Sequence, residues 1–141
     1  MASQAGVEVS MEEVRVLLEA GRIYVDRKEY DKAREVFEGA RELAPDGEAV
    51  LICLANLDLV TGKGADAVKS LKEALKANPK SALAKALLGE AYHTQGKKGD
   101  AEKELKEAKK LDPNGPGGKL ADALLKVMAL GLDYTYGGKK K

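Results

Sequence analysis

The sequence contains few of the residues on which catalytic and metal sites are usually built. Its 141 residues include no tryptophan, one phenylalanine, one cysteine (Cys53) and one histidine (His93). A single cysteine cannot form an intramolecular disulfide, so the sequence does not indicate an oxidising compartment. Metal binding and nucleophilic catalysis need several converging groups, and Cys53 and His93 fall in different predicted helices without such neighbours. We therefore expect no enzyme activity, no catalytic residue, no metal site and no cofactor.

The chain also lacks a large net charge and a long apolar run. Its 24 basic and 23 acidic side chains leave a net charge of +1, whereas nucleic-acid-binding domains are usually strongly basic. No segment approaches the roughly 18 apolar residues of a membrane-spanning helix. The first ten residues, MASQAGVEVS, have neither the basic start nor the apolar stretch of a secretory signal. We expect a cytoplasmic protein that binds no nucleic acid and has no membrane span.

What the sequence does contain is a repeat. Three of its four prolines are Pro45, Pro79 and Pro113, and successive members of this set lie 34 residues apart. A fixed period between about 20 and 50 residues is the signature of a stacked-repeat architecture. Small and bulky apolar residues recur at the same interval: Ala33, Ala67 and Ala101; Phe37, Leu71 and Leu105; Ala40, Ala74 and Ala108; Ala20-Gly21, Leu54-Ala55 and Leu88-Gly89.

At these positions the chain resembles the tetratricopeptide repeat family, whose unit is two antiparallel helices with a proline near its end. The resemblance covers about residues 14–115. Tyr24 and Tyr92 occupy an aromatic position of the family, where repeat two has Asp58, and Lys85 stands where a bulky apolar residue is usual. An isolated buried carboxylate is costly, so we expect Asp58 to meet a lysine, a backbone donor or water. It is either a local structural compromise or a polar anchor for a partner.

The resemblance and the helix signals predict an all-α fold, an α-solenoid of three antiparallel helix pairs with a seventh, capping helix. We expect a single domain over residues 10–133, with repeats at about 14–47, 48–81 and 82–115 and a capping helix at about 117–132. A flexible leader (1–9) and a flexible tail (134–141) flank it. The predicted helices cover residues 11–27, 31–43, 48–61, 65–77, 82–95, 99–111 and 117–132.

In this family, the first helices of successive repeats line a concave groove that contacts partners at five positions of each helix. The resemblance therefore implies a partner-binding groove, whose residues are Arg15, Leu18, Arg22, Val25 and Asp26 in repeat one, Ala49, Ile52, Asn56, Leu59 and Val60 in repeat two, and Leu83, Ala86, Glu90, His93 and Thr94 in repeat three. Its middle helix, 48–61, is apolar almost all round, which is typical of a helix buried on all sides. Either it is simply the central core helix, or an apolar partner segment or the chain's own terminus covers the groove.

One branch of the family binds acidic C-terminal peptides of heat-shock chaperones through a clamp of lysine, arginine and asparagine. The corresponding positions here are Leu18, Arg22, Cys53, Leu83 and Leu87. Only Arg22 is of a clamp residue type. We therefore expect no heat-shock chaperone carboxylate clamp.

The capping helix has two apolar lines. Leu120, Leu124 and Val127 form one of them, and Ala121, Leu125, Met128 and Leu132 form the other. One line must cover repeat three. The other either widens this internal contact or mediates self-association, for which Leu120, Leu124, Val127 and Met128 are the candidate residues of a homodimer.

These features favour a non-enzymatic protein-interaction module whose groove binds a protein or peptide with apolar anchors, in helical or extended form. Two alternatives stay open. One is a small secretion-type chaperone, similar to the type III translocator chaperones, that shields an apolar client. The other is a structural subunit that self-associates through the capping helix.

Overall fold

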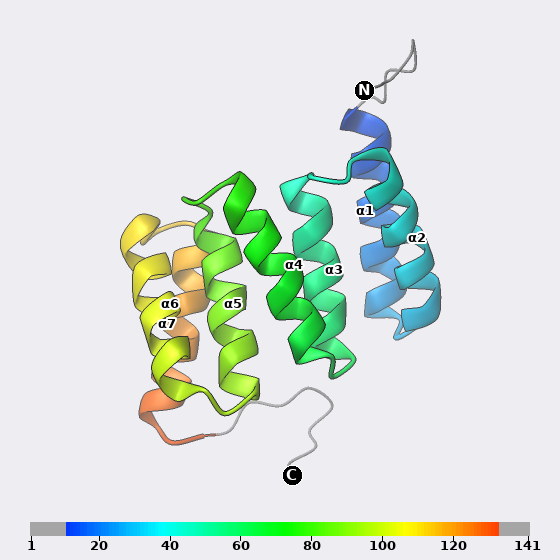
Figure 1. The fold of residues 1–141 in the computed structure, drawn as a ribbon. Helices are drawn as coiled ribbons and strands as arrows, with labels where there is room; N and C mark the ends of the chain where they lie inside the picture. Colours follow the sequence, from blue (N-terminus) through cyan, green and yellow to red (C-terminus); the bar gives the residue numbers. More distant parts are fainter. Residues whose placement is uncertain (1–10, 133–141) are drawn as a thin grey trace.

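The structure is a computed structural model that describes residues 11–132, and these residues form seven α-helices and no strand. It confirms the all-α solenoid (Figure 1). The expectations for residues 1–9 and 134–141 concern segments outside the described part. The helices are α1 (Met11–Asp26), α2 (Tyr30–Leu43), α3 (Glu48–Val60), α4 (Gly64–Ala77), α5 (Ala82–Thr94), α6 (Lys98–Leu111) and α7 (Pro116–Ala129).

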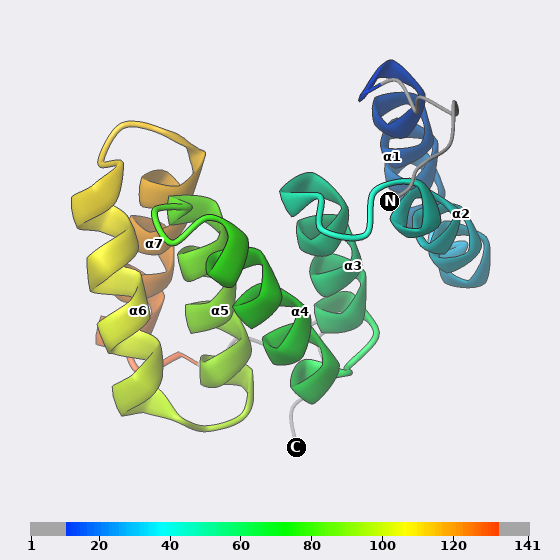
Figure 2. The same ribbon diagram turned by 45° about the horizontal axis from the view of Figure 1, so that its top comes forward.

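The helices are stacked in chain order, so that the α1–α2 pair forms one end and α6 with α7 forms the other (Figures 1 and 2). Each first helix packs against the second helix of its own repeat and against the first helix of the next repeat. Three apolar clusters fill the stack, one between repeat one and α3, one between repeat two and α5, and one between repeat three and α7. Each repeat therefore buries its apolar face only with the help of its neighbour, as in other solenoids.

Each pair turns through one residue in the left-handed region, namely Lys28 (φ 62°), Gly62 (φ 81°) and Gly96 (φ 81°). These residues are also 34 apart, so the turn repeats with the helices. The next N–H closes the end of the first helix in each case. These hydrogen bonds run from Glu29 to the carbonyl of Tyr24 (2.8 Å), from Lys63 to that of Asp58 (2.6 Å) and from Lys97 to that of Tyr92 (2.9 Å).

The repeat prolines terminate the second helices. A proline disfavours helical backbone in the residue before it, and Ala44, Asn78 and Asp112 precede the three prolines with φ between −139° and −150°. Their N–H groups still donate to helix carbonyls, so no donor is lost at these ends. The period of the prolines is thus the period at which the chain leaves one repeat for the next.

The seventh helix ends at Ala129, three residues earlier than the expected residue 132. Gly131 takes φ 74°, and the N–H of Leu132 donates to the carbonyl of Val127 at 3.2 Å. This is the hydrogen-bonding pattern by which a left-handed glycine stops a helix.

Close contact inside each repeat depends on a residue without a large side chain. A Cβ atom built on Gly21 would lie 2.1 Å from Cε1 of Phe37, and one on Gly89 would lie 2.6 Å from Cγ of Leu105. Both partners are buried, at 1% and 0% exposure. The glycines cost helix propensity, roughly 1 kcal/mol each relative to alanine, and the close packing offsets that cost.

We expect Gly21→Ala to lower the free energy of unfolding by about 1–3 kcal/mol, because the added methyl overlaps the Phe37 ring. Gly39→Ala is the matched control, since nothing lies within 4 Å of a Cβ at Gly39 in α2. That change should stabilise the protein by up to about 1 kcal/mol through helix propensity. Urea denaturation followed by circular dichroism measures both. Equal effects of the two substitutions would contradict the packing argument.

Candidate functional site

A hollow of about 370 Å³ lies where the three first helices come together. Val25 of α1, Ile52 of α3 and Leu83 of α5 are half-buried there, one apolar side chain from each repeat. Phe37, Cys53 and Leu87 are buried, and Arg22, Asp26 and Asn56 are exposed. We call this set of nine residues the central hollow. Its buried residues are all apolar or weakly polar, and its charged groups lie among the exposed residues.

A larger hollow of about 560 Å³ lies between the turns of repeats two and three. Its lining consists largely of turn residues such as Thr61, Gly62 and Gln95 and contains no charged side chain. Thr61, Thr94 and Gln95 supply its polar side chains, and it has no continuous apolar surface. The central hollow is the better candidate site.

The structure brings some of the expected groove residues together and separates others. Six of them line the central hollow, namely Arg22, Val25, Asp26, Ile52, Asn56 and Leu83. Four are instead buried in the protein, namely Leu18 (4% exposed), Leu59 (3%), Ala86 (0%) and Glu90 (2%). Leu18, Leu59 and Ala86 belong to the apolar clusters between neighbouring repeats, and Leu59 also lines the larger hollow. These four residues are therefore not exposed, and their role in partner binding stays a prediction.

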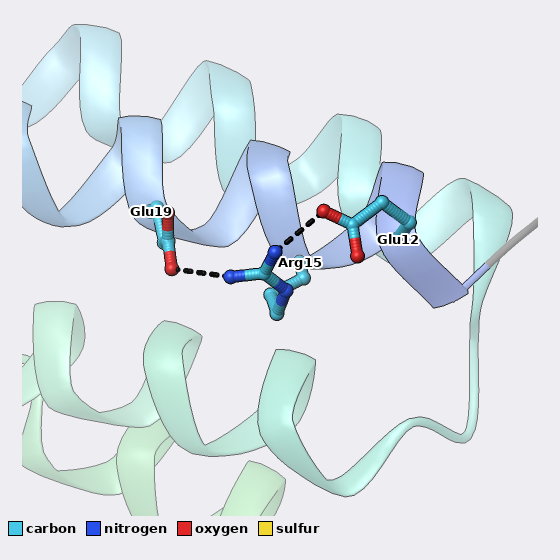
Figure 3. A network of polar contacts seen from close by, with 3 residues as sticks. All are labelled: Glu12, Arg15 and Glu19. Atoms are coloured by element: carbon cyan, nitrogen blue, oxygen red, sulfur yellow. Dashed lines mark hydrogen bonds and ion pairs between the residues drawn. The ribbon is translucent and has the colours of Figure 1, made fainter.

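The remaining expected residues lie outside the central hollow. Ala49 and Thr94 are exposed, Val60 and His93 are half-buried, and Val60 and Thr94 line the larger hollow instead. Arg15 extends along the surface of α1, where its guanidinium group reaches Glu19 at 2.9 Å and Glu12 at 2.5 Å (Figure 3). Exposed pairs of this kind contribute little stability.

Three residues of the central hollow were not among the expected groove residues. Phe37 belongs to a second helix, and the family's contact rule covers only first helices. Cys53 and Leu87 were compared with the clamp and rejected for it, yet their apolar character is what shapes this hollow. The apolar character that excluded the clamp was the signal that could have identified both.

The electrostatics of the central hollow are set by Arg22 and Asp26. Nη2 of Arg22 lies 3.6 Å from Sγ of Cys53. Burial raises the pKa of the Cys53 thiol, and the nearby guanidinium of Arg22 opposes this only in part, so the thiol stays protonated at neutral pH. Within residues 11–132, neither Arg22 nor Asp26 forms an ion pair. Both charges are available to a ligand.

Asp58 is not part of the central hollow, and its partner is neither a lysine nor a backbone donor. Nη2 of Arg34, in the preceding repeat, lies 2.6 Å from its Oδ1, and Asp58 is 4% exposed. Burial raises the pKa of the Asp58 carboxyl, and the hydrogen bond from Arg34 offsets part of this rise. One repeat later, the equivalent positions hold Val68 and Tyr92, which pack against a shared apolar cluster. An ion pair thus replaces an apolar pair at this junction, which is a structural role.

Lys85, the other departure from the family pattern, also joins two helices. Its Nζ lies 3.0 Å from Glu107 and 3.6 Å from Glu104, both in α6. Burial alone would lower the pKa of Lys85, but the hydrogen bond to Glu107 and the charges of both carboxylates raise it overall. The lysine therefore stays charged and ties α5 to α6.

The capping helix uses most of both apolar lines within the chain, although Leu132 is 55% exposed. Leu124 (6% exposed) and Ala121 (0%) belong to the cluster with repeat three, and Leu120 and Met128 pack against the same cluster. Val127 is half-buried. The proposed self-association residues are thus largely engaged by repeat three, and Leu124 is not available at the surface. The broad internal contact is the alternative that the packing supports.

No group of three or more histidine, cysteine, aspartate or glutamate side chains in residues 11–132 is arranged to hold a metal ion. None of the helices in this range combines the length and the apolar character needed to cross a bilayer.

Comparison with known proteins gives the same architecture. Two family profiles, each described as tetratricopeptide repeat, match residues 14–57 and 54–116. A search of curated proteins by sequence gave no match.

Solved structures similar to this chain include the first TPR domain of Spaghetti (RPAP3) bound to the HSP90 peptide SRMEEVD, with a TM-score of 0.71 and 23% identity over 85% of this chain and 99% of that one. The type III secretion translocator chaperone SycD of Yersinia enterocolitica gives a TM-score of 0.76 and 20% identity over 89% and 98% of the two chains. PcrH in complex with the chaperone-binding region of PopB gives 0.72 and 17% over 85% and 97%. At these identities the likeness is one of fold.

We expect Arg34→Met to lower the free energy of unfolding by roughly 2–3 kcal/mol at neutral pH, because it leaves the buried Asp58 carboxylate without a cation. The 30% exposure of the Arg34 side chain keeps the effect below that of a fully buried pair. A carboxyl group whose pKa is higher in the folded than in the unfolded protein lowers the free energy of unfolding when the pH is high enough to ionise it. The deficit should therefore shrink as the pH falls and Asp58 becomes protonated.

The matched control is the double variant Arg34→Val/Asp58→Tyr, which copies the Val68 and Tyr92 junction. Its free energy of unfolding should lie within about 1.5 kcal/mol of the wild-type value, and it should lack the extra pH dependence of Arg34→Met. Urea unfolding at several pH values measures both variants. A pH-independent deficit in Arg34→Met would show that the ion pair is not its cause.

Proposed function

Because the chain belongs to the tetratricopeptide repeat family, we propose that it is a protein-interaction module that binds a peptide segment of its partner in the central hollow. The supporting observation is the convergence of Val25, Ile52 and Leu83 from three different repeats. Half-buried apolar side chains facing one hollow gain from an apolar ligand, since binding removes the rest of their surface from water.

The size and lining of the central hollow favour an apolar anchor. Its volume of about 370 Å³ falls in the range of ligand sites in proteins, which begins near 300 Å³. Peptide recognition in helical grooves usually depends on one or a few apolar side chains that enter such pockets. A leucine, methionine or phenylalanine of the partner is the fitting anchor.

The exposed charges give the bound segment a direction. Arg22 and Asp26 lie one turn apart on α1 and carry opposite charges. A segment with an acidic residue on one side of its anchor and a basic residue on the other matches them in one orientation only. Such pairs act more on specificity than on affinity.

The same residues argue against the chaperone peptide that the similar Spaghetti domain binds. Of the five clamp positions, Leu18, Cys53 and Leu87 are buried and carry no charge, and Leu83 is apolar and half-buried. Arg22 alone cannot hold a terminal carboxylate and an acidic side chain together. The proposed ligand therefore has its apolar anchor within a segment and does not depend on a free C-terminus.

The secretion-chaperone alternative uses the same hollow with a longer apolar client. The likeness to SycD and PcrH is a likeness of fold at 20% and 17% identity, so it does not select a client. This alternative stays a prediction.

Selection of a randomised peptide library on the immobilised full-length protein tests the proposal. We expect enrichment of segments with one large apolar residue and micromolar affinity. Ile52→Glu and Leu83→Glu should each weaken these peptides by at least about tenfold in calorimetric titration, since each places a charge in the hollow. The peptide SRMEEVD should bind no more tightly than about 1 mM, because the clamp is absent.

Leu130→Glu is the control, because Leu130 is 72% exposed beyond α7, at the far end of the stack from α1. Its peptide affinity should equal that of the wild type. Circular dichroism checks that every variant is folded. Leu59 is an expected groove residue, but Leu59→Glu is not a suitable variant because Leu59 is only 3% exposed. Peptides that bind Ile52→Glu and Leu83→Glu as tightly as the wild type would refute the central hollow as their site.

A further inference from the structure

The outer face of α1 exposes two apolar residues at positions that the other repeats bury. Val16 is 53% exposed and Ile23 is 54% exposed. Their equivalents 34 residues later, Val50 and Leu57, are 1% and 0% exposed and pack against repeat one. In repeat three the equivalents are Ala84 and Ala91, both 0% exposed against repeat two. Within residues 11–132, α1 therefore carries a stacking face without a neighbour.

The opposite end of the stack is finished differently. The outward side of α7 carries Lys119, Asp122 and Lys126, and Asp122 pairs with Lys126 at 3.1 Å and with Lys109 of α6 at 2.9 Å. A polar outer face is what keeps the end of a solenoid in contact with water. The outer side of α1 is thus apolar and that of α7 is charged; the exposed leucines near α7, Leu130 and Leu132, follow the end of the helix.

The residues along this face follow a pattern that fits a second copy of the same helix. Glu12, Val16, Ile23 and Arg27 recur at helical spacing, so they form one stripe with an acidic start, an apolar middle and a basic end. Arg27 follows the helix end, and its N–H still donates to the carbonyl of Ile23 at 3.1 Å, so it continues the stripe.

We propose that this α1 stripe is the interface of a homodimer in which two α1 helices pack antiparallel. If the twofold axis passes between Glu19 and Ala20, Val16 of each copy faces Ile23 of the other. The same register places Glu12 opposite Arg27, so one axis satisfies the apolar pair and the charge pair together. A parallel arrangement would instead set Glu12 against Glu12 and Arg27 against Arg27.

The charges of the stripe are available for this contact. Arg27 forms no ion pair within the described residues, and the Glu12 side chain is 64% exposed although it pairs with Arg15. Glu19 lies close to the proposed axis, where two carboxylates would approach each other. Arg15 pairs with the carboxylate of Glu19 at 2.9 Å (Figure 3), which reduces that repulsion.

A hollow of about 420 Å³ lies beside Val16, between the first turns of α1 and the end of α2. Leu17 and Leu43 line it together with Glu12, Glu13 and Val16. The Ile23 side chain of the second copy faces Val16 in the proposed register and enters this hollow. Each copy thus offers one projecting apolar residue and one receiving hollow, as a twofold interface requires.

The dimer is independent of the proposed function. The α1 stripe shares no residue with the central hollow. Peptide binding and dimerisation can therefore succeed or fail separately.

Sedimentation equilibrium of the full-length protein tests the dimer. The wild type should approach twice its chain mass of 15.0 kDa as its concentration rises. Ile23→Asp should raise the dissociation constant at least about tenfold. Val16→Lys is a second variant with the same expected effect, and both positions are exposed enough to leave the fold intact. Leu130→Asp, at the other end of the stack, should dimerise like the wild type.

A charge swap tests the register. Arg27→Glu should weaken the dimer by about tenfold at low salt, because it sets two acidic residues against each other, and less in 1 M salt. Combining Glu12→Arg with Arg27→Glu should restore wild-type affinity. A wild type that stays at 15.0 kDa at every concentration, or a dimer that Ile23→Asp and Val16→Lys leave intact, overturns the proposal. Failure of the swap to rescue overturns the antiparallel register.

Discussion

Everything in this stack depends on how closely the two helices of a repeat approach each other. In repeats one and three a glycine of the first helix faces a buried side chain of the second, Phe37 or Leu105, with no room for a methyl group. In repeat two, Ala55 and Leu71 hold the equivalent positions and are 0% exposed. This approach lets each helix pair present a flat apolar side to the next one. Without it the three clusters between repeats could not close.

The fold could be predicted because its rules recur along the chain. The prolines, the small residues and the turn residues keep one period, and each has a local cause in backbone geometry or helix contact. The site could be predicted only in part, since equivalent positions do not have equivalent neighbours. Leu18 and Ile52 occupy the same place in two repeats, yet Leu18 is buried and Ile52 is only half-buried. Their exposure depends on side chains of other helices, and the period carries no information about these.

The Arg34–Asp58 pair is a second feature that the sequence predicts only in part. Asp58 was recognisable as a departure, but its partner lies in the preceding repeat, across a helix junction. The separation between the two is also that between Val68 and Tyr92, so the geometry of the stack explains the pairing once it is known. A fixed scaffold thus accepts either an ion pair or an apolar pair at one junction. Each solution requires both members, because a buried charge without its partner is costly.

The difference between the two ends of the stack has a consequence for large assemblies. A solenoid with apolar faces at both ends would bind head to tail, and such contacts do not close but grow into filaments. Here Lys119, Asp122 and Lys126 give α7 a charged outer side, while Val16 and Ile23 give α1 an apolar one. In the proposed dimer the α1 face is covered, and the charged outer side of α7 offers no matching apolar face. The charged outer side of α7 thus disfavours growth of a filament by stacking of further copies at that end.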